Sequence, residues 1–319
     1  MTTKNKFITT ALLTTTTLTS IAALNKYLKM TATSKNILTS SDKSTSNFYH
    51  WRLGDIYYTK SGSGRPLLLI HDLNSASSGF QWKQLIPTLS KRYTVYTIDL
   101  LGCGRSEKPY LTYTNYLYVQ MISDFIKSEI GHRTDVIANG NSGNFIVMAC
   151  SHTPELFNRI IWVNPDSVSS YNRLPGKYTK FYKNFLDMPI IGTLLYHITT
   201  SRHSLIDTFK KEYFSNSNSV KESYIDAYYE AAHLGTSPKS ICASVQCKYT
   251  NCNITNALKK IDNSIYLIGG EDLYKKKEIL NEYISYNPAI EYTLIPHTKF
   301  LPHMERPVEF LTAVYTYLS

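Results

Sequence analysis

The sequence predicts an α/β protein in which a mostly parallel central sheet is flanked by helices and interrupted by a helical insertion. Strand-like runs alternate with helical patterns between residues 56 and 164, as they do in βαβ units. Residues 168–258 then have helical patterns without a convincing strand, and strand character returns after residue 259. The sheet domain is therefore interrupted, rather than followed, by the helical segment.

The first elements are short β-rich runs. Residues 56–59 and 67–70 are separated by the turn sequence SGSGRP, so we expect an antiparallel edge strand followed by a core strand. Residues 93–98 form the next strand and precede the glycine-rich turn DLLGCGRS. This order predicts that the sheet begins with antiparallel pairing at one edge.

The middle of the chain supplies the repeating strand and helix pattern. Residues 113–130 have the apolar spacing of a helix that ends at Gly131. Residues 135–138 predict a strand, 145–151 the body of a helix, and 159–164 another strand. Such a rhythm requires crossover connections and hence parallel strands.

The last part of the chain returns to the sheet. Residues 264–268 and 292–295 have strand character, and residues 308–318 form an amphipathic helix. We therefore divide the folded domain, which starts near Phe48, into a first core part (48–167), a helical cap (168–258) and a second core part (259–319).

The N-terminus has the charge layout of an export signal or a membrane anchor. Residues 7–24 carry no charge and follow Lys4 and Lys6. An uncleaved anchor is favoured because no small-x-small cleavage site precedes Lys26. Residues 1–29 are thus predicted to be a signal or anchor, and the Ser, Thr and Lys-rich residues 30–47 a linker. We expect a membrane-anchored or exported protein; the alternative is a cytoplasmic protein with a frayed N-terminus.

The composition argues against several classes of partner. The net charge is +10, but Lys and Arg are scattered and no nucleic-acid module is present, so we expect no nucleic-acid binding. The five cysteines lack partner histidines at metal-ligand spacing, so neither a metal site nor a disulfide framework is expected. No cofactor is predicted.

Three segments carry a resemblance to a known family. They are LLLIHDLNSASSGFQWKQLIPTLSKRYTVYTIDLLGCGRSEKP (67–109), VIANGNSGNFIVMACSHTPELFNRIIWVNP (136–165) and LIPHTKFLPHMERPVEF (294–310). Together they resemble the α/β-hydrolase superfamily, in its esterase, epoxide-hydrolase and haloperoxidase-like branch. The resemblance extends from Phe48 to the C-terminus. It implies an α/β-hydrolase fold with a cap inserted after the sixth strand, and a catalytic triad of nucleophile, acid and histidine.

The nucleophile position of that triad can be aligned in two ways. In the family a tight turn with small residues on both sides presents the nucleophile. The flanking residues favour Gly140 at this position, because a proline usually follows about fourteen residues later and Pro154 has that spacing. The literal G-x-S-x-N pattern instead offers Ser142. A glycine has no atom that could attack a carbonyl, so the favoured alignment removes the acyl-enzyme route.

The histidine position departs from the family as well. The pattern I-P-x-x-G-H-x-P-H-x-E-x-P places Phe300 where the general base usually stands. Without an imidazole, nothing at that point can take and return a proton near neutral pH. His303 matches a second family histidine that is usually structural, and His297 lies three residues upstream of Phe300. Either could substitute only if the loop shifted.

The acid and the oxyanion loop complete the resemblance. If the family's G-x-x-D turn begins at Gly269, the acid is Asp272. If it begins one residue later, Leu273 occupies the acid position. The backbone amides of Leu73 and Asn141 correspond to the oxyanion donors. Asp72 replaces the glycine that usually follows His71, and we expect its side chain to point away as a turn or helix-cap residue.

These departures lead to two functional hypotheses. The first is a protein of this fold with a degenerate triad, which binds a small apolar ligand or a partner in the pocket between core and cap. The alternative is an active, esterase-like serine hydrolase of small ester-like substrates. It would use Ser142 with His297 or His303 and Asp272, and it requires Ser142 Oγ within hydrogen-bond reach of a histidine nitrogen.

Overall fold

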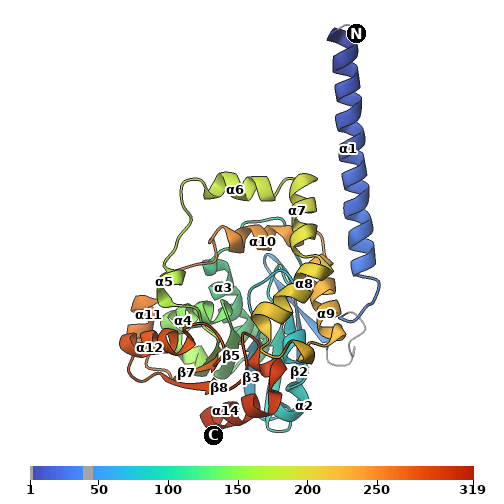
Figure 1. Ribbon diagram of the computed structural model, residues 1–319. Coiled ribbons are helices and arrows are strands. Elements are labelled where there is room, and N and C mark those ends of the chain that lie inside the picture. The colour runs from blue at the N-terminus through green and yellow to red at the C-terminus, as the bar shows by residue number, and fades with distance from the viewer. Residues whose placement is uncertain (1–2, 39–45) are drawn as a thin grey trace.

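The structure, a computed structural model, describes residues 3–38 and 46–319 (Figure 1). Its centre is an eight-stranded sheet with the order β1-β2-β4-β3-β5-β6-β7-β8, in which the pairs β1–β2 and β2–β4 are antiparallel and the others are parallel. The strands are β1 (Ser46–Trp51), β2 (Gly54–Ser61), β3 (Arg65–Ile70), β4 (Tyr93–Ile98), β5 (Thr134–Asn139), β6 (Phe157–Val163), β7 (Ile265–Gly270) and β8 (Glu291–Ile295).

Two central strands position the candidate site. β3 (RPLLLI) and β5 (TDVIAN) each contain a short apolar run, LLLI and VIA, because both faces of these segments are buried under helices. They pair in parallel, with Ile70 opposite Ala138. Their carboxyl ends therefore lie side by side, which brings the loop that follows β3 next to the turn that follows β5.

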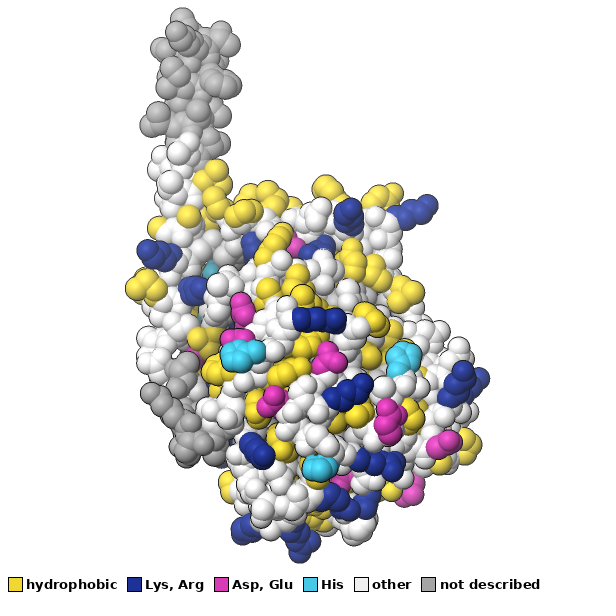
Figure 2. Space-filling view, turned by 180° about the vertical axis from the view of Figure 1, so that it is seen from behind, with side chains coloured by type: hydrophobic (Ala, Val, Ile, Leu, Met, Phe, Trp, Pro, Cys, Tyr) yellow, Lys and Arg dark blue, Asp and Glu magenta, His cyan; other side chains and the backbone are white. Residues whose placement is uncertain are grey.

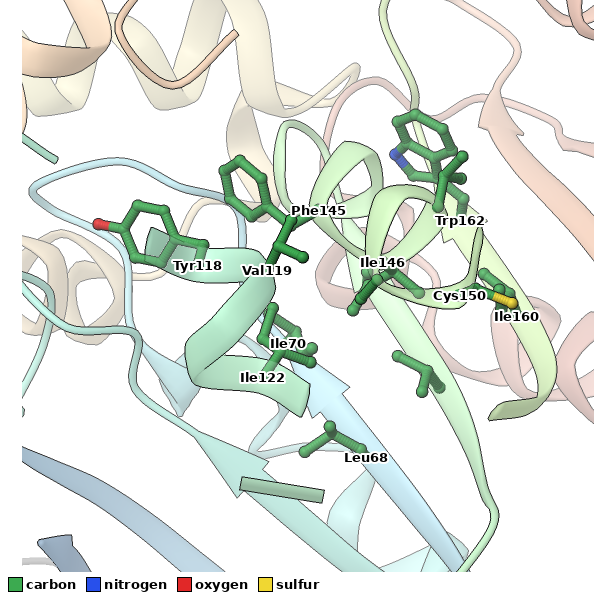
Figure 3. Packing of buried hydrophobic residues seen from close by; sticks show 14 of the residues in the cluster. Leu68, Ile70, Tyr118, Val119, Ile122, Phe145, Ile146, Cys150, Ile160 and Trp162 are labelled. Carbon is green, nitrogen blue, oxygen red and sulfur yellow. The ribbon is translucent and has the colours of Figure 1, made fainter. Parts of the chain in front are cut away.

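Helices cover both faces of the sheet (Figure 1). One face packs under α3 and α4, where Ile122 of α3 and Ile146 of α4 meet Ile70 of β3 (Figure 3). The other face packs against α14, through residues such as Phe310 and Val314. The core helices are η1 (Gly79–Trp82), α2 (Ile86–Leu89), α3 (Asn115–Phe125), η2 (Ile126–Ile130), α4 (Ser142–His152), η3 (Pro154–Leu156), α12 (Lys276–Tyr286), α13 (Pro302–Glu305) and α14 (Pro307–Leu318).

The insertion between β6 and β7 is helical throughout its described elements. It contains α5 (Val168–Tyr171), α6 (Thr179–Leu186), α7 (Ile191–Thr199), α8 (Arg202–Thr208), η4 (Phe209–Tyr213), η5 (Ser217–Ser219), α9 (Glu222–His233), α10 (Pro238–Gln246) and α11 (Thr255–Lys260). The predicted α/β-hydrolase fold, with a mostly parallel sheet and a helical cap after the sixth strand, is confirmed.

The N-terminal segment forms one long helix, α1 (Thr3–Ala32), which projects from the body beside α7 (Figure 1). Asn25 Nδ2 donates to the Ile190 carbonyl at 3.2 Å, and Lys29 Nζ donates to the Gly235 carbonyl. The helix thus continues past residue 29, into the predicted linker; residues 39–45 of that linker lie outside the described residues. Over the described part of the chain, no helix combines the length and hydropathy needed to cross a bilayer.

Candidate functional site

The turn between β5 and α4 places Gly140 at the carboxyl edge of the sheet. Its φ is +52°, in the left-handed region that favours glycine. The Gly140 N–H donates to the Val163 carbonyl at 2.8 Å, and its own carbonyl accepts from Trp162 Nε1 at 2.7 Å. A Cβ at this position would lie 2.3 Å from Asp72 Oδ1 and 2.9 Å from Phe300 Cζ. The surroundings therefore leave no room for a side chain.

Asp72 occupies the space in front of this turn. Its side chain is buried, and Oδ1 accepts a hydrogen bond from the Asn141 N–H at 2.8 Å, while the Leu73 amide also interacts with the carboxylate. The expectation that Asp72 points away from the pocket is wrong. Two backbone N–H groups converge here at the ends of β3 and β5, and a carboxylate is a strong acceptor for such donors.

Burial dominates the electrostatics of Asp72. Desolvation raises its pKa from the usual 3.8 to about 7, although the hydrogen bond from Asn141 opposes this shift. The negative charge of Asp166 raises the pKa further. A carboxyl group that changes its protonation state near neutral pH therefore stands at the centre of the candidate site.

His71 holds the loop that carries Asp72. Its ring is buried, and Nε2 accepts from the Leu100 N–H at 3.0 Å. Nδ1 must then carry the proton, which it donates to the Asp72 carbonyl at 2.7 Å. Desolvation lowers the pKa of His71. Both nitrogens of a neutral imidazole are thus engaged in fixing the backbone after β3.

Phe300 lies on the loop that follows β8, across from Gly140. Its ring stacks on Tyr213 of the cap, with centroids 5.3 Å apart and planes 26° apart. Asn164 Nδ2 donates to the Phe300 carbonyl at 2.9 Å, and the Leu301 N–H donates to the Tyr213 carbonyl at 3.2 Å. The loop is therefore attached both to the core and to the cap.

Ser142 is the buried first residue of α4, and its hydroxyl donates to the His71 carbonyl at 2.5 Å. His303 is fully buried and stacks on Trp82 at 4.2 Å, and burial lowers its pKa to about 3. His297 is exposed and lines a different cavity, beside η5. Within residues 3–38 and 46–319, no hydrogen bond joins Ser142 to either histidine.

Asp272 lies at the rim of the site, after β7. Its N–H donates to the Thr298 carbonyl at 3.0 Å, and its exposed carboxylate accepts from the Ser215 hydroxyl. Leu273 lines the same cavity as Asp272. Both candidates for the acid position, Asp272 and Leu273, therefore line the same cavity.

The cavity between core and cap has a volume of about 560 Å³. It is lined by Asp72, Lys211, Glu212, Tyr213, Asp272, Leu273, Tyr274, Lys299 and Phe300. The structure thus brings Asp72, Asp272 and Phe300 together beside Gly140, whereas Ser142, His297 and His303 do not line it. Sequence reasoning missed Tyr213 and its neighbours on η4, because no local signal indicates which cap residues meet the core.

The fold and this strand-turn-helix site define the class of protein. Residues 67–313 match the α/β hydrolase family, and the chain belongs to that family. An 88-residue stretch is 33% identical to a 2-hydroxy-6-oxo-6-(2'-aminophenyl)hexa-2,4-dienoic acid hydrolase of Metapseudomonas resinovorans, covering 27% of this chain and 30% of that protein. The chain thus matches less than a third of that relative's length.

Several solved structures share the fold over most of this chain. A serine hydrolase involved in carbazole degradation superposes with a TM-score of 0.70 at 18% identity, covering 86% of this chain and 98% of that one. The epoxide hydrolase CorEH does so with a TM-score of 0.69 at 18% identity and the same coverage. A carboxylesterase and a bromoperoxidase are also among these neighbours. Identities this low support the shared fold and nothing finer.

Proposed function

We propose that this α/β-hydrolase-family protein has a degenerate triad and binds a small, largely apolar ligand in the cavity between core and cap. The observation that carries the proposal is the buried carboxylate of Asp72, which accepts the Asn141 amide directly in front of Gly140. A carboxylate fills the place where a reacting carbonyl oxygen would have to bind.

The chemistry of the two aligned positions supports this proposal. Gly140 offers no nucleophilic atom, and its surroundings would not admit a side chain without displacing Asp72 and Phe300. Phe300 cannot carry a proton at the position proposed for the general base. Neither the attack nor the proton transfer of acyl-enzyme chemistry has a group to perform it.

The oxyanion donors are engaged as well. The proposed donors are the amides of Leu73 and Asn141, and both already interact with the Asp72 carboxylate. Transition-state stabilisation in this family needs such donors to be aimed at a developing negative charge. A carboxylate on the same donors opposes that charge by Coulomb repulsion, which is strong in a buried site.

The active-hydrolase alternative is less well supported. It needs the Ser142 hydroxyl to reach an imidazole, yet this hydroxyl donates to the His71 carbonyl at 2.5 Å. His303 is enclosed against Trp82, and His297 lies on the exposed side of its loop. For the Ser142 hydroxyl to reach an imidazole, the first turn of α4 and the loop after β8 would both have to rearrange.

The lining of the cavity indicates the chemistry of the ligand. Tyr213, Leu273 and Phe300 supply apolar walls suited to a flat or aliphatic body. Asp72 supplies a hydrogen-bond acceptor at the inner end. We therefore propose a ligand with an apolar body and one N–H or O–H group that donates to Asp72.

Catalysis is tested with short p-nitrophenyl esters and a serine-reactive phosphonate. We expect no turnover above the buffer rate and no labelling of the native protein. The Ser142→Ala variant should behave in the same way. Turnover or labelling that disappears in Ser142→Ala would favour the alternative and overturn the proposal.

Binding is tested with N-phenylnaphthylamine, an apolar fluorescent amine that carries one N–H donor. We expect saturable fluorescence enhancement that is lost in Leu273→Trp, because the larger ring fills the cavity. Leu53→Trp, at the exposed turn between β1 and β2, is the matched control and should bind as the native protein does. Equal binding by both variants would place the probe elsewhere and contradict the proposed site.

A further inference from the structure

The cap helix α6 turns a stripe of aromatic side chains toward the outside of the molecule. Tyr178, Phe181, Tyr182 and Phe185 follow the spacing of one helix face, and they are 84%, 77%, 50% and 39% exposed. Of the two lysines of this helix, Lys180 is exposed, whereas Lys183 is buried. A helix on the surface of a soluble domain normally turns its apolar stripe inward. An outward stripe therefore indicates that another surface covers these side chains.

A buried ion pair holds α6 in this orientation. Lys183 Nζ lies 2.5 Å from Asp187 Oδ2, and the two side chains are almost fully enclosed. Rotating the helix to bury its aromatic stripe would expose this pair and break its contacts with the cap. The outward stripe is therefore part of the packed arrangement of the cap.

The apolar surface extends beyond α6. Leu174 precedes the helix, and Met188, Ile191 and Ile198 follow it, all of them exposed. We call α6 and these four residues the cap face. Figure 2 shows apolar side chains gathered along the upper edge of the molecule, beside the projecting N-terminal helix. Scattered apolar residues are ordinary on a surface, but a contiguous patch marks an interaction site.

Charge identifies the partner. Residues 167–186 contain no Asp or Glu, whereas Arg173, Lys177 and Lys180 are exposed there. A second copy of the same face would bring like charges together, but an anionic lipid surface would attract them. Aromatic side chains flanked by Lys and Arg are typical of helices that lie in the membrane interface.

The N-terminal helix is directed to the same side. Asn25 attaches α1 beside the start of α7, and the preceding residues 3–24 rise past α6 (Figure 1). This section is about 30 Å long at the rise of an α-helix. In the sequence, residues 7–24 carry no charge, and no acidic residue occurs before Asp42. The Thr19 hydroxyl donates to the carbonyls of its own helix, which lowers the cost of placing it in an apolar medium.

We infer that the cap face docks on an anionic lipid bilayer, with the aromatic side chains of α6 in the interfacial layer and the projecting section of α1 on the membrane side. A lipid surface covers the stripe and neutralises its cations, and it also accommodates α1.

Co-flotation of the full chain with vesicles tests this inference. One set of vesicles contains phosphatidylcholine and phosphatidylglycerol in equal parts, and the other phosphatidylcholine alone. We expect the double variant Phe181→Ser, Phe185→Ser to lower partitioning to the anionic vesicles about a hundredfold, since each ring contributes about tenfold. Val308→Ser, at an apolar position on α14 that is about as exposed as Phe181, is the control and should bind as the native chain does.

A second pair of variants tests the charge. Lys177→Gln with Lys180→Gln should lower partitioning to the anionic vesicles roughly 25-fold, at about 1 kcal/mol for each lysine near the surface. Lys91→Gln, on the exposed turn before β4, should leave it unchanged. Binding that is equal for both vesicle compositions would overturn the inference, and so would native-like binding of the aromatic double variant. Self-association of the native chain that disappears in that variant, without vesicle binding, would assign the cap face to a second copy instead.

Discussion

Gly140→Ala is expected to lower the free energy of unfolding by about 3 kcal/mol. Gly140 has a φ of +52°, where an L residue costs about 1 kcal/mol or somewhat more. The new Cβ would also lie 2.3 Å from Asp72 Oδ1, so the carboxylate would have to leave the Asn141 amide. Losing a charge-assisted hydrogen bond to a buried group costs about 2 kcal/mol more.

Gly131 offers a matched control for the backbone contribution. Its φ is +69°, and nothing lies within 4 Å of a Cβ added there. Gly131→Ala therefore measures the left-handed backbone alone and should cost about 1 kcal/mol. The difference between the two variants isolates the collision of the Gly140 side chain with its surroundings.

Urea unfolding followed by far-ultraviolet circular dichroism gives both free energies. The comparison is repeated in an Asp72→Ala background, where the penalty of Gly140→Ala should shrink by about 2 kcal/mol because no carboxylate remains to be displaced. If Gly140→Ala costs no more than Gly131→Ala, or if the penalty is the same without the carboxylate, the contact between Asp72 and the turn does not constrain position 140, and the reasoning fails.

Three further predictions concern the core and the cap. Because the pKa of Asp72 is raised from 3.8 to about 7, the folded state binds more protons than the unfolded state between these values, so the free energy of unfolding should fall by about 4 kcal/mol as the pH rises through them. Asp72→Asn should remove this part of the slope in urea titrations at successive pH values. Lys183→Met should cost about 3 kcal/mol in thermal or urea unfolding because it leaves Asp187 buried and unpaired, and a second change, Asp187→Leu, should recover most of that loss. Gly143→Ala would place a Cβ 2.1 Å from Trp162 Cε2 and should cost about 3 kcal/mol, visible also as a shift in the tryptophan emission.

Local patterns predicted the strands of the sheet other than β1, and the turn after β5. The short apolar runs LLLI in β3 and VIA in β5 are visible in the sequence because both faces of these segments are buried. β1 was missed because all of its side chains except Trp51 are at least partly exposed, so SNFYHW lacks the alternation of a half-buried strand. That strand exists because it pairs with β2 across a short turn, which is a tertiary constraint.

The direction of the Asp72 side chain could not be predicted locally. In isolation, an aspartate after a strand is a good turn or cap residue. Its actual partner, the Asn141 amide, is 69 positions away and becomes adjacent only when β3 and β5 pair. The same limit applies to Tyr213, which meets Phe300 only after the cap has folded over the core.

The attachment of α1 has a similar origin. The sequence indicated an uncharged N-terminal segment, but not that Asn25 would fasten it beside α7. Nor could the periodicity of α6 indicate which way its stripe faces, because an amphipathic helix can present either side to the domain. The buried pair of Lys183 and Asp187 decides the orientation, and it depends on how the cap packs.

In the sequence, the glycine at 140, the aspartate at 72 and the phenylalanine at 300 look like separate departures from one motif. In space they constrain one another, since a Cβ at 140 would meet both Asp72 Oδ1 and Phe300 Cζ. The carboxylate can accept the Asn141 amide only while position 140 carries no side chain. Under the proposed function, a serine placed at 140 alone would meet an occupied amide and a strained turn, and we expect it to give no esterase activity. We therefore expect ester hydrolysis through a residue at 140 to require changes at Asp72 and Phe300 together with Gly140.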